Sequence, residues 1–210
     1  MRKAFLAAKG NGEGVFSVMR KTILDLGHKI RANYDDESIV VYQAFNDLIA
    51  DYAVANKRFG GEGFNPNRMT WIKPSFLWMM YRCGWGLKDE NQKRILQIRL
   101  PRSVFDAFVR EAVLSTYSSE IYETEKEWQV DIARSNVRCQ WDPERTPFGG
   151  AIGGMRSIQL GLRGKAFQNY NENIIEITDL TRRVHELYQQ RNQPIAEVLS
   201  EKEYIIGQKD

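Results

Sequence analysis

The segment from residue 68 to residue 82, RMTWIKPSFLWMMYR, concentrates side chains that could bind an anionic ligand. Lys73 directly precedes Pro74, and proline is well placed at the start of a helix. A positive side chain beside the positive end of a helix is unfavourable unless an anion joins them, so we expect a phosphate group here. The candidate ligand-binding groups are three cations, two hydroxyls and two indoles: Arg68, Lys73, Arg82, Thr70, Ser75, Trp71 and Trp78. The same run is also typical of a buried helix whose aromatic and methionine side chains are core residues.

A second candidate is the segment VRCQWDPER, residues 137–145, in which a strand is followed by Asp142 and Glu144. Polar groups just past the end of a strand are a common place for a site. A carboxylate there could act as a general base or stabilise a cationic transition state. The alternative is an Asp–Pro turn with an exposed pair between Glu144 and Arg145, which would contribute little energy. The glycine-rich run that follows favours a functional loop, because such loops often serve as lids.

Two further strands carry candidate residues. In SIVVYQAF, residues 38–45, alternation directs either Tyr42 or Gln43 inward, where a buried polar tip needs a partner. An ordinary core tyrosine is the alternative for Tyr42. In RSIQLGL, residues 156–162, Arg156 could pair with one of the two acidic residues above or with a ligand phosphate.

Composition excludes several classes of protein. The 210 residues are 42% hydrophobic and 27% charged, as in a globular domain, and no apolar run approaches the ~20 residues of a membrane span. Two cysteines and two histidines support neither a disulfide framework nor a zinc site. No Ser–His–Asp, HExxH or phosphate-cradle GxxxxGK[ST] arrangement is present. We therefore expect an unprocessed cytoplasmic protein with no metal and no membrane partner.

The net charge of +3 is unevenly distributed. Residues 56–110 hold eleven basic residues against four acidic ones, whereas residues 111–131 hold one against six. Residues 1–34 carry seven basic residues against two acidic ones. A local excess of arginine in a nearly neutral chain indicates a small anionic ligand, such as a nucleotide, more than a long nucleic-acid track.

The periodicity of the chain predicts one α+β domain, residues 30–210, with a curved, mostly antiparallel sheet flanked by helices. Residues 1–29 are expected to form a basic N-terminal extension with one short helix ended by Gly27. Residues 142–154 are expected to be turn-rich and mobile. Strands are predicted at Ser38–Phe45, Met69–Lys73, Arg94–Leu100, Val137–Trp141, Arg156–Leu162 and within 194–207. Helices are predicted after an Asn46 cap, over Ser75–Tyr81 and over Arg102–Leu114, and 173–192 should pass from strand to helix with Asp179 as N-cap.

The runs RANYDDESIVVYQAF, RMTWIKPSFLWMMYRCGW, QWDPER and RSIQLGL resemble a family of bacterial and fungal proteins catalogued as domain of unknown function 4291. The resemblance spans roughly residues 30–207, and the family name implies no activity.

At the level of the fold, the order of motifs is similar to that of the ADP-ribosyltransferase superfamily, although the Glu-x-Glu pair and the Ser-Thr-Ser motif of that superfamily are missing. The resemblance implies that NAD lies across a sheet cleft, with its pyrophosphate held by Arg31, Arg68 and Lys73. Tyr42 and Trp71 would flank the nicotinamide, and Glu144 or Asp142 would steady the oxocarbenium-like ribose or orient the acceptor. The remaining expected NAD-binding residues are Gln43, Thr70, Ser75 and Arg156. The acceptor could be a protein, an RNA or a small molecule.

Two alternatives to this transferase remain open. The excess of basic residues in 1–34 and 56–110 fits a protein that binds or processes RNA, with exposed aromatic side chains as stacking surfaces. A nucleotide sensor without catalysis would use the same pocket. The enzyme hypothesis requires Arg31, Lys73, Glu144 and Arg156 to converge on one cleft.

Overall fold

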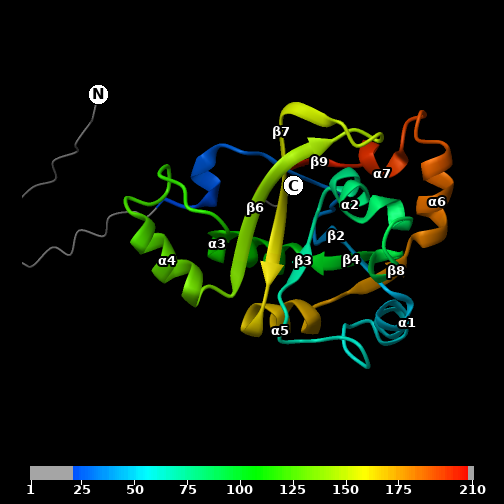
Figure 1. Ribbon diagram of the computed structural model, residues 1–210, viewed down its shortest axis with the longest axis horizontal. Helices are drawn as coiled ribbons and strands as arrows, with labels where there is room; N and C mark the ends of the chain where they lie inside the picture. Colours follow the sequence, from blue (N-terminus) through cyan, green and yellow to red (C-terminus); the bar gives the residue numbers. More distant parts are fainter. Residues whose placement is uncertain (1–20, 208–210) are drawn as a thin grey trace, which may run out of the picture.

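The computed structural model describes residues 21–207, and its strands form three mostly antiparallel sheets (Figure 1). The first sheet pairs β1, Ile30–Ala32, with β9, Lys202–Tyr204. The second has the order β2, Ser38–Phe45; β4, Arg94–Pro101; β8, Glu176–Asp179. The third has the order β3, Thr70–Ile72; β7, Ala151–Leu162; β6, Val137–Arg145; β5, Val113–Leu114, of which only β5 and β6 are parallel.

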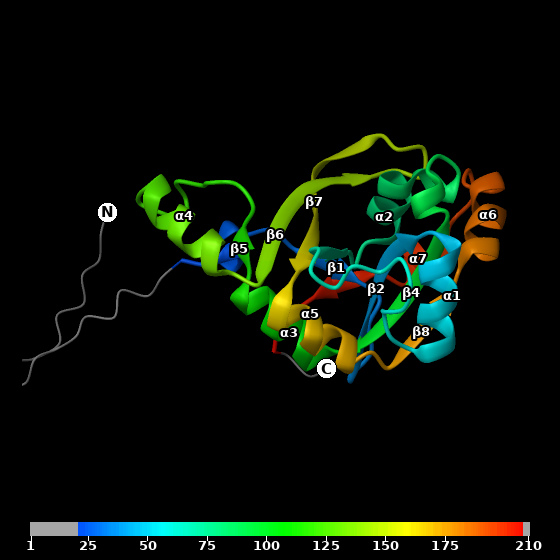
Figure 2. The same ribbon diagram turned by 60° about the horizontal axis from the view of Figure 1, so that its bottom comes forward.

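Helices surround these sheets, and α4 and α6 lie at opposite ends of the molecule in both views (Figure 2). The helices are α1, Asp47–Asn56; α2, Phe76–Cys83; α3, Arg102–Glu111; α4, Glu125–Arg134; α5, Gly164–Glu172; α6, Thr181–Gln189; and α7, Ala196–Leu199. The predicted α+β class with mostly antiparallel pairing is confirmed, although the strands form three sheets rather than one. Within residues 21–207, every helix is too short or too polar to cross a membrane.

Strand β2 is buried on both faces, and it separates the core into two clusters. Ile39 and Val41 pack into the larger cluster, whereas Val40 and Tyr42 pack into a second one together with α2 and α6. This pattern follows from the alternation of side chains along a strand. The strand ends at Phe45, and the side-chain oxygen of the next residue, Asn46, accepts the Ile49 amide at 3.1 Å and caps α1 as predicted.

One backbone hydrogen bond joins the second and third sheets. The Tyr42 amide at the middle of β2 donates to the Lys73 carbonyl just after β3, at 2.7 Å. The sheets therefore meet where two of the predicted binding segments cross.

Several element boundaries differ from the prediction. The helix expected over Arg102–Leu114 ends at Glu111, because the apolar run continues into β5. Residues 142–154 are mostly the two strands of the β6–β7 hairpin, with a bulge between Pro143 and Arg145. The N-cap residue of α6 is Leu180 and not Asp179 as predicted, although Asp179 accepts the Thr181 amide at 2.8 Å. Helix α5 was not predicted.

The predicted N-terminal extension lies partly outside the described residues. Its described part forms a 3-10 helix, Ile23–Leu26, capped at its start by Thr22 and ended by Gly27 with a φ of 70°. Ile23 is buried in the larger core cluster, so this end of the extension packs on the domain.

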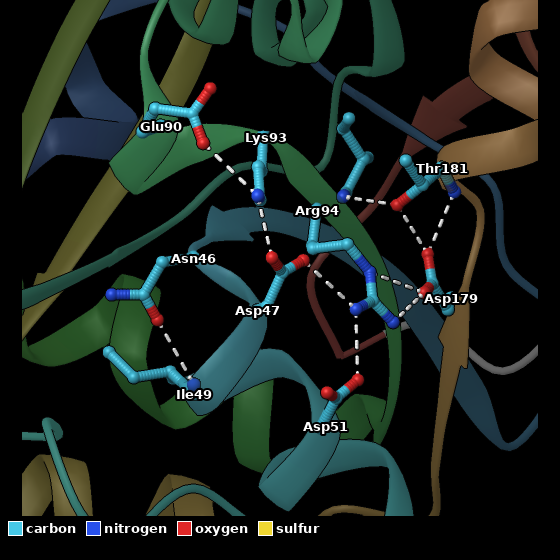
Figure 3. A network of polar contacts seen from close by, with 10 residues as sticks. Asn46, Asp47, Ile49, Asp51, Glu90, Lys93, Arg94, Asp179 and Thr181 are labelled. Carbon is cyan, nitrogen blue, oxygen red and sulfur yellow. Dashed lines mark hydrogen bonds and ion pairs between the residues drawn. The ribbon is translucent and has the colours of Figure 1, made fainter.

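A polar network around Arg94 fixes the start of α1 against β4 and β8 (Figure 3). The guanidinium donates to Asp51 at 2.9 Å, to Asp47 at 3.2 Å and to Asp179 through Nε at 2.9 Å. Burial alone would raise the pKa of Asp179, but the bonds from Thr181 and Arg94 outweigh it and hold that pKa below its usual value. The network therefore stabilises the charged carboxylate.

Replacing Arg94 with methionine should destabilise the protein by about 2–3 kcal/mol at pH 7, because Asp179 would lose its partner while partly buried. The Asp179 contribution is present above the unfolded pKa of about 3.9 and is lost as pH falls through the lower folded pKa. Urea unfolding at pH 7 and pH 3 should therefore show a smaller penalty in acid. Arg182→Met, at an exposed pair with Glu186, should stay within about 0.5 kcal/mol of the parent. An equal loss in both variants would contradict this role.

Candidate functional site

A cleft of about 730 Å³ opens beside the junction of the second and third sheets. Its walls come from the end of β2 and the start of α1, the loop before β3, α2, the 3-10 turn Glu90–Gln92 and the β6–β7 pair. Most polar and aromatic lining side chains are cations, amides and rings: Arg68, Lys73, Arg82; Gln43, Asn46, Asn65, Asn91, Gln92, Gln140, Gln159; Phe45, Phe64 and Trp71. The carboxylate of Asp89, the hydroxyl of Thr70 and the apolar side chains of Ala44, Ile49, Met69 and Met79 also line the cleft. Residues of the segment 68–82 therefore line one cavity together with residues from distant parts of the chain.

Gln43 organises the inner wall of the cleft. Its amide nitrogen donates to the Thr70 hydroxyl at 2.6 Å and to the Trp71 carbonyl at 3.3 Å. Its amide oxygen accepts the hydroxyl of Tyr170, which is fully buried on α5, at 2.6 Å. These bonds satisfy the buried amide and hold β3 in place, so Gln43 positions its neighbours as well as lining the cavity.

Trp71 lies against a glycine of the neighbouring strand. A Cβ at Gly161 would come within 2.6 Å of the Met69 sulfur and 3.0 Å of the indole ring. The absence of a side chain at Gly161 therefore lets Trp71 lie close over β7, where it forms a flat wall of the cleft.

Lys73 is the buried cation of the cleft, with 5% of its surface exposed. Its amine donates to the Trp71 carbonyl at 3.1 Å. Burial, and then the nearby Arg82 charge, lower the pKa of Lys73 to about 7, while Cys83 and Asp142 act in the opposite direction. Lys73 therefore titrates near neutral pH, and an anion beside it would favour its charged form.

Arg68 and Arg82 complete the positive charge of the cleft, and both are exposed to solvent. Within residues 21–207, no carboxylate forms an ion pair with either guanidinium. Both guanidiniums can therefore donate to an anion that enters the cleft. Asp89 also lines the cleft, and hydrogen bonds from Gln92 and Asn91, and then the charge of Arg82, lower the pKa of its carboxyl group.

Polar side chains form a line across β6 and β7 at the back of the cleft. The amide nitrogen of Gln159 donates to Gln140 and to the Asp142 carboxylate, both at 2.7 Å. Asp142 is half-buried and is close enough to influence the pKa of Lys73. Of the two acidic candidates, Asp142 is thus the one that forms a hydrogen bond with a residue lining the cleft.

Glu144 lies further along the same line and is buried. One carboxylate oxygen accepts the Ser157 hydroxyl and the other accepts the Arg145 amide, the latter at 2.8 Å. Tyr42 is also buried, and its hydroxyl has no hydrogen-bond partner among the described residues. Neither Glu144 nor Tyr42 lines the cleft.

The start of α2 is occupied by a side chain of the chain itself. Ser75 is the N-cap and accepts the Trp78 amide at 3.2 Å, while the Phe76 amide donates to Glu201 at 2.6 Å. The guanidinium of Arg31 donates to the Glu201 carbonyl at 2.8 Å. The carboxyl group of Glu201 therefore lies where the sequence led us to expect a phosphate, and neither Ser75 nor Arg31 lines the cleft.

Arg156 lies on an exposed part of β7, opposite Pro143 in the β-ladder. Of the four residues whose convergence the enzyme hypothesis requires, only Lys73 lines the cleft. The predicted residues that the structure does bring together there are Arg68, Thr70, Trp71, Lys73, Arg82 and Gln43. The residues that sequence reasoning missed as a group are the amides, above all Gln140 and Gln159.

The described residues contain no group of three or more histidine, cysteine or acidic side chains arranged to hold a metal ion. The chain is thus an α+β protein with a deep polar cleft whose walls carry unpaired arginines, amides and aromatic rings. It belongs to the family described as Domain of unknown function (DUF4291), which matches residues 29–204. No curated protein matches the chain.

Proposed function

We propose that the protein binds a phosphate-bearing nucleotide in the cleft between its second and third sheets. The observation that carries the proposal is the meeting of three cations with many side-chain amides and an indole in a single cavity. Its volume of about 730 Å³ lies within the range of about 300–1,000 Å³ that is usual for small-molecule sites.

Each part of a nucleotide has a matching chemistry on the walls. Arg68 and Arg82 can donate bidentate, charge-assisted hydrogen bonds to phosphate oxygens, and a phosphate near Lys73 would favour its protonated form. Trp71 offers a flat ring on which a base can stack. The amide nitrogen of Gln140 can donate and the amide oxygen of Gln159 can accept, as the edge of a base requires, whereas both N–H groups of Gln159 are already engaged.

NAD is the nucleotide that the resemblance to ADP-ribosyltransferases suggests, and one observation favours transfer of ADP-ribose as a second candidate function. Asp142 is a half-buried carboxylate that accepts a hydrogen bond from Gln159, a residue of the cleft wall, although Asp142 does not itself line the cleft. A carboxylate so placed could stabilise the positive charge that develops on the ribose when nicotinamide leaves. Glu144 has both oxygens engaged, so the geometry favours Asp142 for this role.

Calorimetric titration with NAD, ADP-ribose, ADP and adenosine tests both functions. We expect the three phosphate-bearing ligands to bind at least about 10-fold more tightly than adenosine, because only they engage the arginines. Nicotinamide released from NAD would be measured in the same samples. Asp142→Asn should keep its affinity for NAD and lose at least about 100-fold in nicotinamide release.

The two functions fail separately. Equal binding of adenosine and ADP, or no binding of either, would refute the nucleotide site. Tight binding of NAD without release of nicotinamide, over a range of protein, RNA and small-molecule acceptors, would refute the transferase and leave a nucleotide-binding protein.

A further inference from the structure

A second group of cations and rings lies outside the cleft, where the tip of the β6–β7 hairpin meets α2 and the end of α6. We call it the stacking face. The tip of this hairpin reaches over α2 toward the end of the molecule formed by α6 (Figure 1). The stacking face consists of Trp78, Tyr81, Arg145, Phe148, Tyr188 and Arg191.

The first half of the stacking face is built on α2. The Arg145 guanidinium lies 3.8 Å from the centre of the Tyr81 ring and 5.6 Å from that of Trp78. The two rings are themselves stacked, with centres 5.4 Å apart. Tyr81 nevertheless keeps 44% of its surface exposed, so one side of this stack remains open to a further flat group.

The second half joins the hairpin tip to the end of α6. The Arg191 guanidinium lies 4.0 Å from the centre of the Tyr188 ring and 5.2 Å from that of Phe148. Phe148 is 68% exposed at the tip of the hairpin. An exposed ring that already contacts a guanidinium offers a flat surface on which a base could stack.

The charge of the stacking face is positive. Neither Arg145 nor Arg191 forms an ion pair with a carboxylate anywhere in the part of the chain that the structure describes. The Arg145 Nε is moreover buried without a hydrogen-bond partner in that same part. A partner for this face should therefore combine negative charge with flat rings, which is the composition of a single-stranded nucleic acid.

The stacking face and the cleft take residues from the same helix, α2. Tyr81 belongs to the stacking face, and the next residue, Arg82, lines the cleft. We propose that the protein recognises one nucleotide of a single-stranded nucleic acid in the cleft and stacks flanking bases on Tyr81 and Phe148. This inference rests on the proposed nucleotide site, and it assigns that site a polymeric ligand.

Fluorescence anisotropy with labelled single-stranded RNA and DNA of about ten nucleotides, within the usual span of such sites, tests the inference. The full chain should bind the strand at least about 10-fold more tightly than ADP, and raising the salt concentration should weaken it. The double variant Tyr81→Ala/Phe148→Ala should lose at least about 10-fold in strand affinity and keep its affinity for ADP. The control Leu87→Ala/Leu199→Ala, at two other exposed apolar side chains, should bind like the parent.

Three results would overturn the inference while ADP still binds. These are a strand that binds no more tightly than ADP, an unchanged strand affinity in the Tyr81/Phe148 variant, and polyglutamate that competes as well as the strand does. Competition by polyglutamate would show that the stacking face binds acidic polypeptide and not nucleic-acid bases. Failure of ADP itself to bind would instead refute the nucleotide site on which the inference rests.

Discussion

Replacing both Arg68 and Arg82 with alanine is expected to weaken binding of ADP by about 100-fold or more. Each guanidinium lines the cleft and forms no ion pair with a carboxylate among residues 21–207, so its donors can engage a phosphate, although the carboxylate of Asp89 lines the cleft near Arg82. A hydrogen bond to a charged group contributes about 1.5–3 kcal/mol, and two such losses exceed a factor of 100. Isothermal titration at low salt measures the effect.

The matched control replaces two arginines outside the cleft, Arg134 and Arg182, which lie exposed on α4 and α6. It removes the same net charge, so any general electrostatic attraction falls equally in both proteins. We expect the control to lose less than about 3-fold. A comparable loss in the two double variants would show that the cleft arginines act only through the overall field.

Replacing Glu201 with glutamine is expected to stabilise the protein by on the order of 2–4 kcal/mol at pH 8. Burial, and then the nearby Glu144 charge, raise the pKa of Glu201 to about 8, although the Phe76 amide acts against them. Because the unfolded pKa is about 4.3, the parent loses stability as pH rises from about 4 through 8. Glutamine keeps an oxygen for the Phe76 amide and has no charge to bury, so the loss of stability that Glu201 causes over this range should be absent from the variant.

Urea unfolding at several pH values measures this difference. Glu203→Gln is the control, because Glu203 lies two residues further along, exposed and paired with Lys29. It should follow the pH dependence of the parent and differ by less than about 1 kcal/mol. A parent protein whose stability does not fall between pH 5 and pH 8 would show that Glu201 is not held in a charge-excluding environment.

Local signals in the sequence predicted much of the fold. Strand β2 and helix α1 were predicted closely because alternation and a capping side chain, Asn46, are encoded within a few residues. Helix α5 was missed although Ala166, Phe167 and Tyr170 have helical spacing and are buried. Its first residue, Gly164, has a φ of +51° and resembles a turn signal in the sequence.

The strands Val137–Trp141 and Arg156–Leu162 were predicted, but residues 142–154 between them were expected to be turn-rich for a similar reason, whereas most of them extend β6 and β7. Pro143 and the glycines of residues 149–154 are turn formers, yet here Pro143 lies beside a bulge, where a strand tolerates a missing amide. Strand β6 finds its hydrogen-bond partners in β7. The extension of both strands into residues 142–154 depends on this pairing, which no local signal in the sequence shows.

The candidate site was predictable only within segments. Arg68, Lys73 and Arg82 are close along the chain, so their shared chemistry was visible in the sequence. Gln159 reaches the cleft because β7 pairs with β3 and β6, which bring residues about 90 positions apart into one wall. The Glu201 carboxyl at the start of α2 has no local signal at all, because 125 residues separate it from Phe76.

The Tyr42–Lys73 bridge lies where the two sheets that form the cleft meet. Gln43 belongs to the second sheet and Gln159 to the third, and both line the cleft. A molecule that touched both side chains would add a contact between the two sheets. Its binding energy would then add to the free energy of unfolding in proportion to the logarithm of its concentration, so thermal melting alone could report which ligands the cleft accepts.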